Sequence, residues 1–334
     1  MDQSIWTRFA HRSVIDQAHV GPEEVFTVLT DDRMNPVIAE ACFNVGLAQT
    51  SSTQLVVMRS YHSSEEPVHL NKAAAALLRE SDVVLSICQT RVGQIPEVHQ
   101  ALEGGTRFLL AEPEDRTDFL IDGLINLDYD QMVRNASLFS EFWAEGGSCR
   151  ILSQEGTDLT FEVGERPVSA SEGAVSKPGE LDWYPGCMVS VAPIEPTING
   201  TVVVDGSLFP FGLVPDNVIV QIKNGVIRDV SGGPFAVRWK AWLDSLNDEV
   251  AYQLCHVSFG FNPRAELTGR ITEDERVLGA LTVGFGRQAA DFQGGVKGGE
   301  HHLDIIARSP TLVAGDKTLL EANVLNLELG FVAL

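Results

Sequence analysis

The sequence predicts an α/β protein of two parts: a doubly wound domain with a parallel sheet over residues 1–147, then a mostly antiparallel β (α+β) domain over residues 148–334. In the first part, short and continuously apolar strands alternate with helical segments, which is typical of a parallel sheet covered on both faces. Near Gly146-Gly147 the pattern changes. From there short strands follow one another across turns, as they do in antiparallel sheets.

The elements of the first part follow in regular order. The run from Val25 to Thr30 is a compact strand, and Asn35-Pro36 is a helix-start signal because Asn caps a helix and Pro fits its first turn. No GxGxxG follows this strand and no GxxxxGK[ST] occurs, so nucleotide binding by a glycine loop is not predicted. We expect strands over residues 25–30, 54–58, 82–87 and 107–111, and helices over residues 5–19, 36–46, 73–78, 96–103, 115–123 and 128–146.

The second part contains short strands separated by turns. Asn224-Gly225 favours a type I′ hairpin, because both residues accept the positive φ that this turn requires. Trp239 and Trp242 lie in a segment with helical character. We expect strands over residues 150–152, 159–163, 201–204, 218–222 and 303–306, and one helix over residues 239–246.

Composition narrows the function classes. The 334 residues include 24 basic and 46 acidic ones, for a net charge of −22, which disfavours nucleic acid and anionic membranes as partners. There is no apolar run of about 18 residues and no signal-peptide pattern at the start. Five scattered cysteines indicate reduced thiols. We therefore expect a cytoplasmic protein without membrane segments, and we expect it to form a homo-oligomer.

A glycine-rich stretch, residues 294–304, carries the first chemical signal. Four glycines lead into His301-His302-Leu303-Asp304, at the start of an expected strand. Side chains two residues apart on a strand point to the same side, so His302 and Asp304 would project together as two metal ligands. A twist in the loop would replace His302 by His301. From spacing alone, a His-x-Asp pair is more often a local hydrogen bond than a metal site.

The best third ligand is His256. Two histidines and one carboxylate with open positions suit a non-haem Fe(II) oxygenase. Arg264, eight residues further on, could clamp an anionic substrate oxygen or make a surface ion pair. His62 follows the second strand and Gln94 the third, and both could face a cleft, because open α/β sheets bind ligands at the carboxyl ends of their strands. No Gly-x-Ser-x-Gly is present, so hydrolysis through a serine nucleophile is not supported.

Several segments resemble the 2,5-dihydroxypyridine 5,6-dioxygenase family, within the wider aminopeptidase T superfamily. The resemblance covers most of the chain and is most specific in residues 247–304. It rests on His256-Val-Ser-Phe-Gly-Phe-Asn-Pro-Arg-Ala265, residues 277–286, and Gly294-Gly295 through His302-Leu-Asp304. It implies an Fe(II)-dependent, extradiol-type enzyme that cleaves a hydroxylated N-heterocycle or related aromatic with O₂. The single iron would be held by His256, His302 and Asp304.

The resemblance also separates the two branches of the superfamily. The peptidases hold two metals, with Glu and His ligands besides the shared His-x-Asp. Met188 and Thr282 stand at two of those positions, and neither can replace the lost ligand, so a single iron fits better. The alternatives are an aminopeptidase T-like metallopeptidase and a metal-free binding protein with the same fold.

One departure from the family concerns the general base. Gln94 stands where the dioxygenases have a histidine that acts on the substrate hydroxyl, and Gln cannot accept a proton at neutral pH. Either His62 or His99 replaces it, or the substrate needs no base. We also expect the glycine loop to close over the metal when substrate binds.

Overall fold

The computed structural model describes residues 3–61, 68–93, 95–112, 117–145, 147–288 and 292–334. The chain forms two compact units. The first contains Met1–Tyr129 and Ser171–Gly186, and the second contains Asp130–Ala170 and Cys187–Leu334. In the described part of the chain, no helix is both long enough and apolar enough to cross a membrane.

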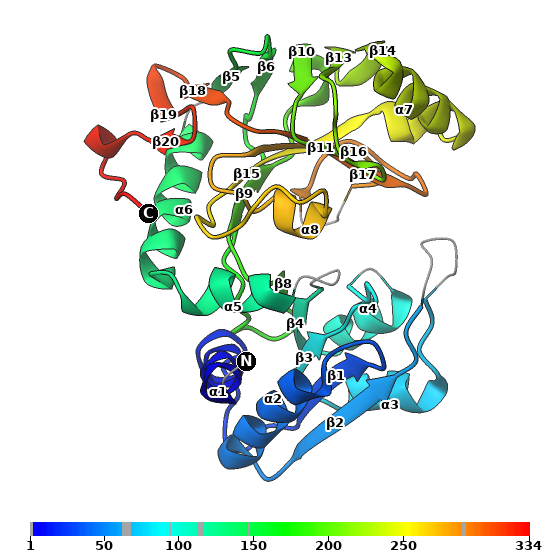
Figure 1. Cartoon of the computed structure of the whole chain (residues 1–334), viewed down its shortest axis with the longest axis vertical. Helices are drawn as coiled ribbons and strands as arrows, with labels where there is room; N and C mark the ends of the chain where they lie inside the picture. Colours follow the sequence, from blue (N-terminus) through cyan, green and yellow to red (C-terminus); the bar gives the residue numbers. More distant parts are fainter. Residues whose placement is uncertain (1–2, 62–67, 94, 113–116, 146, 289–291) are drawn as a thin grey trace. The chain divides into compact units, whose positions relative to one another are not determined.

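The first unit is built on a five-stranded sheet in the order β2-β1-β3-β4-β8, in which all neighbouring strands are parallel. Helices connect its first four strands, which are coloured blue to cyan in Figure 1. This confirms the predicted doubly wound parallel sheet. The strands are β1 (Phe26–Asp31), β2 (Thr53–Met58), β3 (Val83–Ile87), β4 (Arg107–Ala111) and β8 (Leu181–Trp183).

The helices of this unit begin where the sequence signals lie. The side chain of Asn35 accepts a hydrogen bond from Val37 N and caps α2, and Pro36 occupies its first turn. The helix predicted over residues 5–19 is instead α1, which ends at His11 and continues as a π-helix, η1 (Arg12–Gln17). The helices are α1 (Gln3–His11), α2 (Pro36–Gln49), α3 (Lys72–Arg79), α4 (Pro96–Glu103) and α5 (Thr117–Ile125).

The chain returns to the first unit after it has begun the second. Strand β8 pairs in parallel with β4, so that Phe108 lies opposite Leu181 and Leu110 opposite Trp183. Helix α6 (Tyr129–Glu145) lies almost wholly within the second unit. By packing, the chain is therefore divided at three points, whereas the sequence pattern suggested a single boundary near residue 148.

The second unit contains an eight-stranded and a seven-stranded sheet, which are built from antiparallel strand pairs. The predicted type I′ hairpin is present between β13 and β14, since Asn224 and Gly225 have φ values of 52° and 73°. The larger sheet comprises β14 (Val226–Gly232), β13 (Val218–Lys223), β10 (Asn199–Val204), β6 (Asp158–Glu162), β5 (Ser148–Leu152), β18 (Thr311–Ala314), β19 (Lys317–Glu321) and β20 (Val324–Leu325). The smaller comprises β12 (Gly212–Leu213), β11 (Ser207–Leu208), β17 (His302–Ala307), β16 (Leu281–Gly286), β15 (Leu254–Gly260), β9 (Met188–Val191) and β7 (Val168–Ser171).

Helix α6 anchors the smaller sheet through aromatic side chains. The ring of Phe139 lies 5.7 Å from that of Phe259 and 5.0 Å from that of Phe261, and Trp143 lies 5.6 Å from Phe259. All four are buried. Strand β15 is thereby held on one side by an aromatic core. Two further helices belong to this unit. The predicted tryptophan-bearing helix is α7 (Pro234–Ser245), which begins earlier than expected because Pro234 occupies its first turn. The short helix α8 (Ile271–Asp274) follows β15.

Candidate metal centre

Three neighbouring strands of the smaller sheet bring the predicted ligands together. In β15, β16 and β17, His256 lies opposite Gly284, and Gly284 lies opposite Asp304. His302 lies two residues before Asp304 and opposite Gly286. The ligands therefore come from two outer strands, and the middle strand contributes glycine at both facing positions.

The donor atoms of the three side chains converge on one point. His256 Nε2 lies 3.2 Å from Asp304 Oδ1, His302 Nε2 lies 3.3 Å from Asp304 Oδ2, and the two Nε2 atoms are 3.4 Å apart. Ligands about 2.1 Å from one metal ion lie about 3.0–3.4 Å from one another in octahedral or tetrahedral geometry. The observed separations, measured to one or the other oxygen of Asp304, fall within this range.

Gly284 provides the room for this convergence. A Cβ atom built on Gly284 would lie 2.1 Å from His256 Nε2 and 2.3 Å from His256 Cδ2. Any other residue on the middle strand would therefore occupy the position of the imidazole. The sequence could not predict this role of Gly284, because the role depends on the register of the three strands.

The orientation of His302 also suits a ligand. Its Nδ1 lies 2.8 Å from the carbonyl oxygen of Arg287, to which it donates a hydrogen bond. That bond holds the hydrogen on Nδ1 and directs Nε2 toward Asp304. The neighbouring His301 is turned elsewhere, since its Nδ1 donates to Asp248 Oδ2 at 3.2 Å. Of the two alternatives left by the sequence, the structure places His302 beside Asp304.

The carboxylate of Asp304 fits a bound cation. Asp304 is only 8% exposed, and its Oδ1 has no hydrogen bond although His256 Nε2 is 3.2 Å away. That separation is an ion-pair distance without hydrogen-bond geometry. A buried carboxylate oxygen without a hydrogen bond is costly unless a charge compensates it. A metal ion between Asp304, His256 and His302 would supply that charge.

In the absence of a metal ion, the charges of His302 and Asp304 shift each other's pKa. Burial disfavours the charged forms, but the carboxylate of Asp304 outweighs it and holds the pKa of His302 well above its ordinary value. Burial likewise raises the pKa of Asp304, and the two histidines more than reverse this, leaving it below its ordinary value. A metal ion must displace the proton of His302, so its affinity falls as the pH falls.

Cys255 lies near the ligands but is not well placed to be one. Together with His256 and His302 it forms a group whose donor atoms lie within 4.8 Å of one another. Its Sγ, however, is 3.7 Å from His302 Nδ1, the nitrogen already bonded to Arg287. Burial also raises the pKa of the Cys255 thiol, which opposes the thiolate form that binds metals. Asp304 is therefore better placed than Cys255 to act with His256 and His302.

An aromatic ring and an anchored loop border the site. Phe292 stacks on His256 with ring centroids 5.1 Å apart and an interplanar angle of 16°. The glycine loop after it is held near its start, because Glu195 accepts hydrogen bonds from Gly295 N at 2.5 Å and Arg166 Nη2 at 3.0 Å. Near its end, Asp248 accepts from Glu300 N at 2.9 Å. Sequence analysis missed these partners because they lie far away in the chain.

The other residues predicted from the sequence do not form part of this cluster in the described structure. His62 and Gln94 lie outside the described residues. Arg264 is exposed, and its backbone N–H donates to the side chain of the buried Asn262 at 2.9 Å. Met188 pairs with Gly260 in the sheet, and Thr282 pairs with Ser258.

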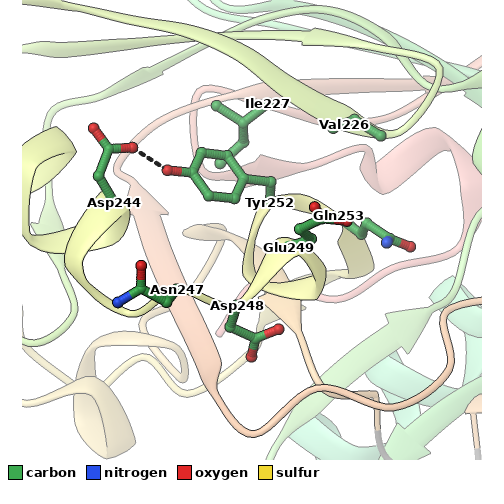
Figure 2. A pocket seen from close by; sticks show the side chains of 8 residues that line it. All are labelled: Val226, Ile227, Asp244, Asn247, Asp248, Glu249, Tyr252 and Gln253. Atoms are coloured by element: carbon green, nitrogen blue, oxygen red, sulfur yellow. Dashed lines mark hydrogen bonds between the residues drawn. The ribbon is translucent and has the colours of Figure 1, made fainter.

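A separate pocket of about 530 Å³ lies beside the 3₁₀ helix η3 (Glu249–Tyr252) (Figure 2). Its lining includes Asp244 and Asp248 but none of the three predicted ligands. Asp244 accepts hydrogen bonds from Tyr252 and from Lys240 Nζ, and Asp248 holds the end of the glycine loop. These carboxylates thus already have protein partners, and the pocket is not the metal centre.

The chain is similar to known proteins over most of its length. The family model of 2,5-dihydroxypyridine 5,6-dioxygenase (NicX) matches residues 7–325. The 2,5-dihydroxypyridine 5,6-dioxygenase of Pseudomonas putida KT2440 is 25% identical over 265 residues, which cover 75% of this chain and 73% of that protein. The solved 2,5-dihydroxypyridine dioxygenase of Pseudomonas putida KT2440 matches with a TM-score of 0.81 at 22% identity over 98% of both chains. Wild-type AmpT from Thermus thermophilus matches with a TM-score of 0.63 at 14% identity, over 96% of this chain and 99% of its own.

Proposed function

The chain belongs to the 2,5-dihydroxypyridine 5,6-dioxygenase family, and we propose that it cleaves the ring of a dihydroxypyridine or a closely related hydroxylated aromatic with O₂. One Fe(II) ion, held by His256, His302 and Asp304, is the proposed cofactor. The observation that carries this proposal is that two imidazole Nε2 atoms, 3.4 Å apart, each lie 3.2–3.3 Å from one oxygen of the buried Asp304 carboxylate, whose Oδ1 has no hydrogen bond.

The donor set suits Fe(II) and a negatively charged substrate. Two neutral imidazoles and one carboxylate carry a single negative charge, so an Fe(II) site keeps one net positive charge. Bound there, Fe(II) would supply coordination of substrate and O₂ and the transfer of electrons between them. His256 and His302 would hold the metal ion in place, and Asp304 would balance part of its charge.

The residues around the ligands have proposed roles toward the substrate. Phe292 stacks on His256 and offers an apolar ring surface at the site, which suits an aromatic substrate. Arg264 would pair with a negatively charged substrate oxygen, and His62 would act as the general base in place of Gln94. The roles of Arg264, His62 and Gln94 remain predictions from the sequence.

Anaerobic reconstitution with Fe(II), followed by O₂ uptake with a panel of dihydroxypyridines and phenols, tests the proposal. We expect about one iron per chain and O₂ consumption with a dihydroxypyridine. Asp304→Ala should abolish both tight iron binding and turnover. His11→Ala is the matched control, because His11 is an exposed histidine at the end of α1, in the other unit.

A different outcome would favour the peptidase branch. Two metal ions per chain, both needed to hydrolyse amino-acid amides, without O₂ uptake, would replace the dioxygenase by an aminopeptidase T-like enzyme. Purified protein that binds neither iron nor zinc would support a metal-free binding protein. The expected homo-oligomer and cytoplasmic location stay predictions, which light scattering and cell fractionation can check.

A further inference from the structure

Two buried serine hydroxyls stand behind His256. Its Nδ1 lies 2.9 Å from Ser258 Oγ, and Ser258 Oγ donates a hydrogen bond to Ser190 Oγ at 2.8 Å. Ser258 is 0% exposed and Ser190 is 5% exposed. The two serines are register partners on β15 and β9, so the sheet itself holds them side by side.

The direction of these hydrogen bonds determines the tautomer of His256. A serine hydroxyl has one hydrogen, and that of Ser258 is directed to Ser190. Toward His256 the oxygen of Ser258 can therefore only accept. Nδ1 of His256 must then carry the ring hydrogen, and Nε2 keeps its lone pair. Nε2 is the atom that lies beside Asp304 and His302.

We propose that the Ser190–Ser258 pair positions His256 as its Nδ1–H tautomer and thereby makes Nε2 available as a ligand; this rests on the proposed metal site. Ligating histidines usually donate their second N–H to a carboxylate, a carbonyl or water. Here the acceptor is an uncharged hydroxyl, just as His302 donates to an uncharged carbonyl. The serine pair fixes the ring without adding negative charge to the site.

The tautomer can be measured without metal or turnover. Long-range ¹H–¹⁵N correlation spectra of the metal-free protein distinguish the two tautomers of the neutral ring. We expect hydrogen on Nδ1 in the wild type and a shift toward the Nε2–H form in Ser258→Ala. A wild-type ring with its hydrogen on Nε2 would overturn the proposal. His256→Gln assigns the signal.

Metal affinity gives the second readout. In a chelator competition under anaerobic conditions, Ser258→Ala should bind Fe(II) about 10–100-fold more weakly, the range for residues that orient metal ligands. Ser190→Ala should act in the same direction, because without Ser190 the hydroxyl hydrogen of Ser258 is free to be donated to Nδ1 of His256. Ser86→Ala is the matched control, since Ser86 is a buried strand serine of the first unit that donates to Cys88 Sγ.

The two readouts separate this proposal from the function on which it rests. Unchanged Fe(II) affinity in Ser258→Ala would remove the serine pair from the site while leaving the dioxygenase proposal intact. A wild-type protein that binds no Fe(II) would overturn the proposed function, and the tautomer spectrum would still decide the role of the serines. If Ser258→Ala does not fold, Ser190→Ala and the wild-type spectrum decide.

Discussion

At the scale of single residues, Gly284 is the position on which the convergence of the ligands depends. It lies between His256 and Asp304 on the middle strand, where a side chain would overlap the imidazole. The chain around it is a buried strand, so neither the backbone nor the ring can move away easily. A single methyl group is therefore expected to separate the ligands.

We predict that Gly284→Ala weakens Fe(II) binding at least as much as the loss of an orienting residue, about 10–100-fold. The chelator competition described above measures this. Gly156→Ala is the control for a glycine in a turn of the same unit, where the nearest atom to an added Cβ is 3.7 Å away. Its φ of 111° makes alanine costly for stability but leaves the metal ligands untouched. Equal affinities in Gly284→Ala and wild type would contradict the role of Gly284.

The His302–Asp304 pair predicts a pH dependence for the metal-free protein. The pKa of His302 is raised above its unfolded value near 6.5, so its contribution to stability is complete below about pH 6.5 and is lost as the pH rises through the folded value. The pKa of Asp304 is lowered, so its contribution is present above about pH 4 and is lost as the pH falls further. Both contributions are present between about pH 4 and 6.5.

Urea unfolding of metal-free protein between about pH 6 and 9 should therefore show a loss of stability with rising pH that His302→Gln lacks. Saturating metal should remove this dependence, because the metal replaces the proton on His302. Parallel curves for wild type and His302→Gln would contradict the pairing.

The site shows where sequence reasoning succeeds and where it stops. His302 and Asp304 share one strand, so a two-residue period was enough to place them together. His256 lies on another strand, so the sequence offered it only as the best candidate for a third ligand, and the family resemblance then supported it. Gly284 and Ser190 could not be predicted, because their roles depend on which strands are neighbours and in which register.

At the scale of elements, the glycine loop is more constrained than its composition suggests. Its start is held by Arg166 and Glu195 and its end by Asp248. Val296 within it is buried. Any closure over the metal would therefore be confined to Lys297 and the two glycines after it, rather than involve the whole loop.

We predict that Glu195→Ala releases the start of this loop. Hydrogen exchange of the Gly295 amide should become faster, because that N–H loses its acceptor, while the Glu300 amide, held by Asp248, should change little. Asp248→Ala should give the reverse pattern. Protection that is the same in all three proteins would show that these carboxylates do not anchor the loop.

The aromatic contacts of helix α6 lead to a second prediction at this scale. Phe139→Ala should destabilise the protein by about 3–5 kcal/mol, the usual cost of removing a buried phenylalanine. Urea unfolding measures the change. Val237→Ala is the control, since Val237 is 67% exposed and should stay within about 0.5 kcal/mol of wild type. A small effect of Phe139→Ala would mean that the aromatic core of β15 can repack.

Periodicity predicted most elements of the first unit, because their apolar runs are long and bounded by Asn, Pro and Gly. Strands β3 and β4 and helix α4 lie within a residue of their expected bounds. Strand β8 was missed, because it has only three residues and its parallel partner lies more than seventy positions earlier.

At the scale of the whole molecule, β8 makes the first unit dependent on a distant segment. It covers β4, whose Phe108, Leu109 and Leu110 are fully buried. Without β8, β4 would be an apolar edge strand, which favours aggregation. The stability of the first unit therefore depends on residues 171–186, which follow the first strands of the second unit in the chain.

We predict that a fragment of residues 1–147 aggregates, whereas residues 1–129 joined through a flexible linker to residues 171–186 form a soluble monomer. Size-exclusion chromatography and urea unfolding distinguish the two. A monomeric, cooperatively unfolding fragment 1–147 would show that β8 is dispensable.

Because β8 lies late in the chain, the sheet of the first unit cannot be completed until well after its first four strands have been synthesised. The first 129 residues can leave the exit tunnel before the strand that completes their sheet has been made. At about 5–20 residues per second, residues 130–186 take roughly 3–11 s to synthesise. During that interval the nascent chain exposes the unprotected edge of β4, and this is the period in which a chaperone that binds apolar segments would have its target.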